Sequence, residues 1–70
     1  MEEIKIKGWI ARDKSGDIHF FNVKPYREYP VLWWQTNVDI DDMFYLPPES
    51  FPEVKWEDEP IEVELTIKPI

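Results

Sequence analysis

The N-terminal third of the chain contains two alternating segments on either side of a turn sequence. From Ile4 to Arg12 the side chains alternate between two faces, which is typical of a β-strand. The next five residues are Asp-Lys-Ser-Gly-Asp, in which Asp13 suits the first position of a type I turn and Gly16 suits the left-handed position of a bulge. We therefore predict a β-hairpin whose second strand covers residues 18–23.

The same turn predicts which residues of the two strands face each other. A loop formed by the Lys-Ser-Gly triplet places Ile10 opposite Phe20 and Trp9 opposite Phe21. Both pairs then match an apolar side chain with an apolar side chain across the strands. A slip of one residue would put Ile10 opposite His19 and would exchange the two faces of the sheet. Turn chemistry and hydrophobic pattern therefore indicate one register.

Three further segments are predicted to be strands: residues 31–36, residues 43–46 and residues 61–68. Residues 24–30 have no clear period and are expected to form a loop, and residues 37–42 an acidic turn. After Pro48, the ring of Pro52 and the β-branched Val54 leave room for little more than one helical turn. The middle of the chain is thus expected to add short strands and loops to the hairpin.

The first and last predicted strands carry opposite charges on their polar faces. Lys5 and Lys7 lie on the polar face of the first strand, and Glu62 and Glu64 lie on that of the last. Opposite charges at facing cross-strand positions contribute roughly 0.2 to 1 kcal/mol per pair. We therefore predict that the terminal strands pair and that Leu65, on the apolar face, is buried. The predicted fold is mainly β, a small antiparallel sheet of four or five strands with at most one short helical turn.

The chain has 70 residues and no cysteine, so its core has to be stable without a disulfide or a thiolate metal site. In agreement, 43% of the residues are apolar and 16% are aromatic, and the absence of a repeat or long linker predicts one domain over residues 1–70. The lack of cysteine and an acidic N-terminal segment unlike a signal peptide predict a cytoplasmic location. The sequence also lacks the run of ~20 apolar residues that a membrane span needs.

The formal net charge of −7 is concentrated in the second half of the chain. Residues 1–35 carry six bases and five acids, a balance of +1, whereas residues 36–70 carry two bases and ten acids, a balance of −8. Nucleic-acid affinity comes largely from Lys and Arg side chains that neutralise phosphates. The charge distribution therefore argues against direct binding of DNA or RNA.

The sequence contains no convincing catalytic or metal-binding set. His19 is the only histidine, and it is expected to be an ordinary, partly exposed strand residue. With a single histidine and two loop serines, the groups of a nucleophilic triad are not assembled. The nearest approach to a cation loop is formed by Asp39, Asp41 and Asp42. This stretch lacks the glycine and the final glutamate of an EF-hand, so we predict a solvated turn, no metal, no cofactor and no enzymatic activity.

Aromatic side chains point to both faces of the predicted sheet. Trp33 and Trp34 are adjacent in a predicted strand, so one ring lies on each face, and the pattern does not decide which of them is buried. Trp9 and Phe21 also lie on the face opposite Ile10. Either loop residues cover this second face, or it is an exposed patch that binds a protein partner or a second copy of the chain. The loop side chains considered as cover are Tyr26, Tyr29 and Phe51.

Two blocks of the sequence carry a resemblance. One is Gly-Trp-Ile-Ala-Arg-Asp-Lys-Ser-Gly at residues 8–16 with Lys24-Pro25 downstream, and the other is Phe-Pro-Glu-Val-Lys-Trp-Glu-Asp-Glu-Pro-Ile-Glu-Val-Glu-Leu at residues 51–65. In these blocks the chain resembles short uncharacterised proteins encoded by gut Bacteroides-type bacteria and their phages or other mobile elements. The resemblance implies an accessory protein of a mobile element, and it carries no catalytic residue.

Two functions fit these observations. The first is a protein-interaction or regulatory module that acts through the aromatic side chains or the acidic half. The second is an acidic mimic of DNA, in which an exposed corner formed by Glu57, Asp58 and Glu59 binds the nucleic-acid groove of a host protein. Mimicry rests on charge and is expected to weaken steeply with salt, whereas an aromatic interface is not.

Overall fold

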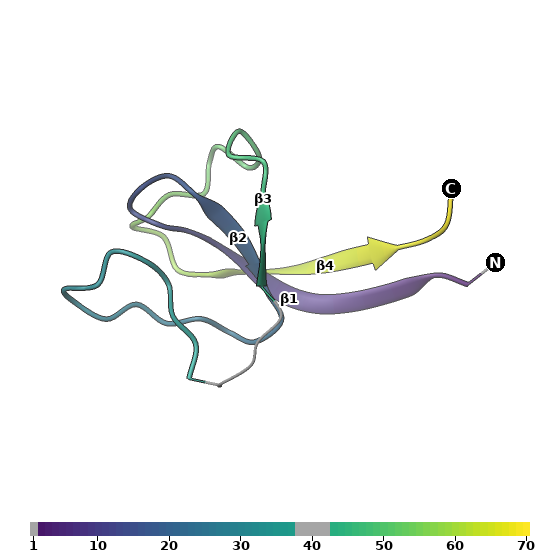
Figure 1. The fold of residues 1–70 in the computed structure, drawn as a ribbon, viewed down its shortest axis with the longest axis horizontal. Coiled ribbons are helices and arrows are strands. Elements are labelled where there is room, and N and C mark those ends of the chain that lie inside the picture. Colours follow the sequence, from purple (N-terminus) through teal and green to yellow (C-terminus); the bar gives the residue numbers. More distant parts are fainter. Residues whose placement is uncertain (1, 38–42) are drawn as a thin grey trace.

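In a computed structural model, which describes residues 2–37 and 43–70, the chain forms one antiparallel sheet (Figure 1). The strands are β1 (Ile4–Arg12), β2 (Ile18–Phe21), β3 (Met43–Leu46) and β4 (Ile61–Ile67). Their order across the sheet is β3-β2-β1-β4. The mainly β fold, the N-terminal hairpin and the paired terminal strands are thus confirmed, and no helix occurs in the described part of the chain.

The hairpin has the predicted register, with Ile10 opposite Phe20 and Trp9 opposite Phe21. The turn closes through the Asp13 N–H, which donates to the Asp17 carbonyl at 2.7 Å, and Gly16 adopts a positive φ of 104°. Because glycine has no β-carbon, it takes this conformation without steric cost. The second strand nevertheless ends at Phe21, two residues earlier than predicted.

The prediction of a strand over residues 31–36 is wrong. This segment forms only an isolated bridge, in which Tyr26 and Gln35 exchange backbone hydrogen bonds at 2.7 and 2.9 Å. Two further backbone groups of the segment bind the hairpin turn, because the Leu32 carbonyl accepts from the Lys14 N–H and the Trp34 N–H donates to Asp13 Oδ1. Contacts with the turn have therefore replaced a strand ladder.

The predicted acidic turn extends beyond the described residues. Of residues 37–42, only Asn37 is described, so the cluster of Asp39, Asp41 and Asp42 lies outside the described residues.

Each face of the sheet carries its own hydrophobic core. On the first face, Ile10, Ile18, Phe20 and Val54 are buried together. On the second face, the buried residues are Ala11, Phe21 and Trp34, and Trp56 packs against them. Aromatic side chains from loops therefore cover the second face, as one of the two expectations held, but they are Trp34 and Trp56. The prediction that Tyr26, Tyr29 and Phe51 provide this cover is wrong, because their side chains are exposed.

Two arginines fasten the loops to these cores. The Arg12 guanidinium donates to backbone carbonyls in the segment that covers the first face, including Val54 at 2.7 Å and Ser50 at 2.7 Å. On the second face, the Arg27 guanidinium lies 4.7 Å from the ring centroid of Trp34 and 5.1 Å from that of Trp56. Arginine suits both positions because its planar group offers several donors and also stacks on aromatic rings.

Candidate interaction face

One end of the sheet consists of two strands only. β4 pairs with β1 from Ile4 to Ile10, but β2 pairs with β1 only from Trp9 to Arg12. The first half of β1 and the second half of β4 therefore extend away from the rest of the chain and end at the two termini (Figure 1). We call this extension the ribbon. A two-stranded ribbon is marginally stable by itself, so a contact that buries its side chains would stabilise it.

One side of the ribbon is apolar, and Phe44 of β3, the strand beyond β2, lies on the same side of the sheet. We call this side the ribbon face, and it is formed by Ile4, Ile6, Phe44, Val63, Leu65 and Ile67. The exposed fraction is 48% for Ile4, 42% for Phe44 and 50% for Ile67. Contiguous exposed apolar side chains of this kind mark interaction surfaces in monomeric proteins.

The ribbon face is hollowed where it meets the core. A groove of about 420 Å³ runs between the rings of Phe20 and Phe44 on one side and Ile6, Leu65 and Ile67 on the other. The two rings are stacked, with centroids 5.1 Å apart and planes 20° apart. This groove offers a partner an aromatic wall and an aliphatic wall.

A close approach at Gly8 builds the groove. A β-carbon at Gly8 would stand 2.3 Å from Phe20 Cζ and 2.5 Å from the Phe21 carbonyl oxygen. The Phe20 ring therefore lies directly over the Gly8 backbone. Glycine is required because any side chain would displace the ring.

The opposite side of the ribbon is charged. Lys5 and Lys7 of β1 and Glu62 and Glu64 of β4 are all exposed there. Lys7 faces Glu64 directly, as the predicted pairing of opposite charges requires, whereas Lys5 faces Thr66 and Glu62 faces Trp9. The ribbon is therefore amphipathic, with one apolar side and one charged side.

The four aromatic residues predicted as contact residues do not form one surface. Phe21 and Trp34 are buried, at 1% and 5% exposure, so their assignment to a contact surface is wrong. Their burial follows from the second core, which sequence alone did not locate. Trp33 is 58% exposed and lines a hollow at the hairpin turn, and Trp9 is half-buried on the second face. The ribbon face was missed, although its signal was present in the apolar positions of the two terminal strands.

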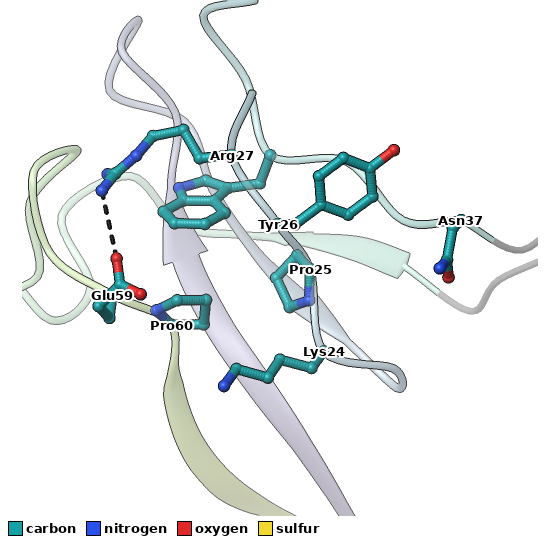
Figure 2. Close-up of a pocket in the computed structure, with 8 residues that line it drawn as sticks. Lys24, Pro25, Tyr26, Arg27, Asn37, Glu59 and Pro60 are labelled. Carbon is teal, nitrogen blue, oxygen red and sulfur yellow. Dashed lines mark hydrogen bonds and ion pairs between the residues drawn. The ribbon is translucent and has the colours of Figure 1, made fainter. Parts of the chain in front are cut away.

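The three acids of the predicted corner are exposed, and two of them have partners within the chain. Asp58 Oδ2 accepts a hydrogen bond from the Lys55 N–H at 2.9 Å. Glu59 lies 3.3 Å from Arg27 (Figure 2). The Arg27 guanidinium also donates to the Trp56 carbonyl. A polar hollow of about 480 Å³ lies beside this ion pair, lined by residues that include Lys24 and Pro60. The Arg27 contacts connect the corner to the second core, whereas the Asp58 hydrogen bond closes the turn of the corner itself.

The single histidine is not where sequence predicted it. His19 is 5% exposed instead of partly exposed, because β2 is paired on both edges and covered on both faces. Its Nδ1 lies 3.5 Å from Asp13 Oδ2 and makes no hydrogen bond. Burial raises the pKa of Asp13, although the hydrogen bond from the Trp34 N–H and the nearby His19 lower it. No nucleophile accompanies this pair in the contacts described.

Within residues 2–37 and 43–70, no three His, Asp or Glu side chains gather closely enough to share a metal ion. The same residues contain no helix with the length and apolar character needed to cross a membrane.

Comparison of the chain with protein-family models, with curated proteins and with solved structures finds no match.

Proposed function

We propose that the chain is a non-catalytic protein-interaction module that binds a partner through the ribbon face. The observation that carries the proposal is the exposure of Ile4 and Ile67, which face each other on a ribbon that has little other support. Phe44 of β3 is also exposed and lines the same groove as Ile67. Burial of apolar surface contributes about 25 cal/mol per Å², so a partner that covers these side chains would gain affinity and stabilise the ribbon together. Phe44 supplies the aromatic anchor that is common at interface hot spots.

Two features of the sequence support a cellular location and a genetic origin for this module. The absence of cysteine supports a role in the cytoplasm, where disulfides are rare. The resemblance at residues 8–16 and 51–65 supports an accessory role in a mobile element. On this proposal the partner is a protein of the same cell, and the chain regulates or recruits it by binding.

The acidic DNA mimic is the alternative function. Its support is the exposure of Glu57, Asp58 and Glu59 and the charge of −8 in the second half of the chain. The contacts of Asp58 with Lys55 and of Glu59 with Arg27 give these acids a structural role as well. Two of the three acids thus have partners within the chain, whereas the exposed isoleucines of the ribbon have little cover. The structure therefore supports binding through the ribbon face more strongly than mimicry of DNA.

The test is quantitative capture of the partner by the tagged chain at low and high salt. The variant Ile4→Ser with Ile67→Ser removes two apolar side chains from the ribbon face, and Lys5→Ser with Lys68→Ser is the matched control. We expect the first pair to lose the partner at both salt concentrations and the control to retain it. Retention by both pairs, together with loss on reversal of Glu57, Asp58 and Glu59 to lysine, would overturn the proposal in favour of mimicry.

A further inference from the structure

The free edge of β4 lies directly beside the ribbon face. In the described part of the chain, β4 pairs with β1 on one edge and with no strand on the other. An edge strand presents unpaired backbone N–H and C=O groups, which form a template for an added strand. The edge has not been blunted by proline, because Pro60 precedes the strand and Pro69 follows it.

The side chains of β4 define which side chains an added strand would need on each side of the sheet. Residues that face each other across paired strands lie on the same side of the sheet. A strand added beside Val63, Leu65 and Ile67 would therefore place alternate side chains on the apolar ribbon face. Its remaining side chains would lie beside Glu62 and Glu64 on the charged side.

The chain already contains one strand that meets both requirements. On the inner edge of β4, Ile6 of β1 faces Leu65 and Lys7 faces Glu64. The β1 sequence Ile-Lys-Ile-Lys thus matches apolar with apolar at both isoleucines and base with acid at Lys7, whereas Lys5 faces Thr66. The outer edge presents this same alternation with no partner among the described strands.

Charge decides between a second copy and a different partner. Two β4 edges brought together would place Glu62 and Glu64 of both copies on one charged surface, and each copy has a formal net charge of −7. Like charges at facing strand positions are destabilising. A basic segment is attracted at the same positions, as Lys7 illustrates within the chain.

We infer that the partner contributes an extended segment of alternating apolar and basic residues, which adds as a strand to the free edge of β4. This inference rests on the proposed function and names the chemistry and the binding mode of its partner. The apolar side chains of the segment extend the ribbon face, and its Lys or Arg side chains lie beside Glu62 and Glu64.

The test uses three fluorescein-labelled nine-residue peptides, one alternating Ile and Lys, one alternating Ile and Glu, and one alternating Ser and Lys. Binding to the full chain is measured by fluorescence anisotropy, and the contact is mapped by NMR shifts of backbone amides. We expect the Ile–Lys peptide to bind at least tenfold more tightly than the others and to shift β4 amides. Equal binding of the Ile–Lys and Ile–Glu peptides, or shifts confined to other strands, would overturn the inference.

A variant pair isolates the acidic side chains of β4. We expect Glu62→Gln with Glu64→Gln to weaken binding of the Ile–Lys peptide roughly twofold to thirtyfold, because two cross-strand charge pairs are lost. The matched control, Glu49→Gln with Glu53→Gln, changes the net charge equally at exposed positions of the loop and leaves affinity unchanged. If both pairs weaken binding equally, attraction is non-specific and the inference fails.

The proposed function fails on a separate result, namely that the chain with Ile4→Ser and Ile67→Ser still captures the natural partner.

Discussion

The ring of Phe20 lies against the backbone of Gly8, so closely that a β-carbon at Gly8 would stand 2.3 Å from Phe20 Cζ. This contact lets Phe20 join the core beside Ile10 while it also forms one wall of the groove in the ribbon face. The interior of the domain and its proposed binding surface therefore share one side chain. A change at Gly8 is expected to affect both stability and binding.

We predict that Gly8→Ala destabilises the fold by about 3 kcal/mol or more, because the new methyl group meets both Phe20 and the Phe21 carbonyl. The matched control is Gly16→Ala, whose β-carbon meets no atom within 4 Å and suffers only from the positive φ of 104°. That strain costs about 1 to 2 kcal/mol. Urea denaturation measures both free energies of unfolding, and a smaller loss for Gly8→Ala than for Gly16→Ala would contradict the close approach.

We predict that Arg12→Lys costs about 2 to 4 kcal/mol, although it preserves the charge. The Arg12 guanidinium binds several backbone carbonyls of the covering segment, and a lysine ammonium cannot reach them together. Hydrogen exchange is expected to accelerate around Val54, which is buried on the first face. Lys55→Ala, at an exposed position nearby, serves as the control. Unchanged protection of Val54 in Arg12→Lys would show that the segment is held by its apolar contacts alone.

We predict that Leu65→Ala is less damaging than Ile10→Ala. Sequence placed Leu65 in the core, but its side chain is only partly buried on the ribbon face, whereas Ile10 is 3% exposed. The expected costs are about 1 to 2 kcal/mol for Leu65→Ala and about 3 to 4 kcal/mol for Ile10→Ala. Thermal unfolding of the two variants compares them directly, and an equal loss would place Leu65 in the interior.

We predict that Asp13 makes the chain less stable as the pH rises through its raised pKa. Desolvation raises the pKa of Asp13 above its unfolded value, so the folded state binds the proton more tightly. The protonated group favours folding at low pH, and this advantage disappears as the carboxyl ionises. Asp13→Asn keeps an oxygen to accept from the Trp34 N–H and removes the ionisation.

Unfolding of the chain and of Asp13→Asn at a series of acidic to neutral pH values tests this sign. The difference in unfolding free energy, Asp13→Asn minus the unchanged chain, is expected to grow with rising pH. The groups that face Asp13, namely His19 and Asp17, are present in both proteins. A difference that shrinks with rising pH would mean that attraction to His19 outweighs desolvation.

Turn chemistry and side-chain alternation explain what could be predicted from sequence. The hairpin register was predictable because the turn around Gly16 and the apolar pairs such as Ile10 with Phe20 require the same alignment. The pairing of the terminal strands followed from their alternating pattern and from opposite charges such as Lys7 and Glu64. The turn depends on neighbouring residues, and the terminal strands carry complementary alternating patterns, so sequence indicates both although the paired strands lie at opposite ends of the chain.

The parts that sequence missed depend on contacts between distant segments. Residues 31–36 read as a strand, but the bond from the Trp34 N–H to Asp13 holds them at the hairpin turn instead. The burial of Trp34 follows from its contact with Trp56, which is far away in sequence. The ribbon face had a detectable signal, because the terminal strands have more apolar positions than the four-residue strand β2 can cover.

The most direct test of the proposed interaction face is methyl NMR of the isoleucine-labelled chain in complex with the partner recovered by capture. The complex is expected to transfer saturation from the partner to the methyl groups of Ile4, Ile6 and Ile67, and not to those of Ile10 and Ile18, which are buried in the core. A complex in which saturation reaches none of the ribbon isoleucines Ile4, Ile6 and Ile67 would contradict the account.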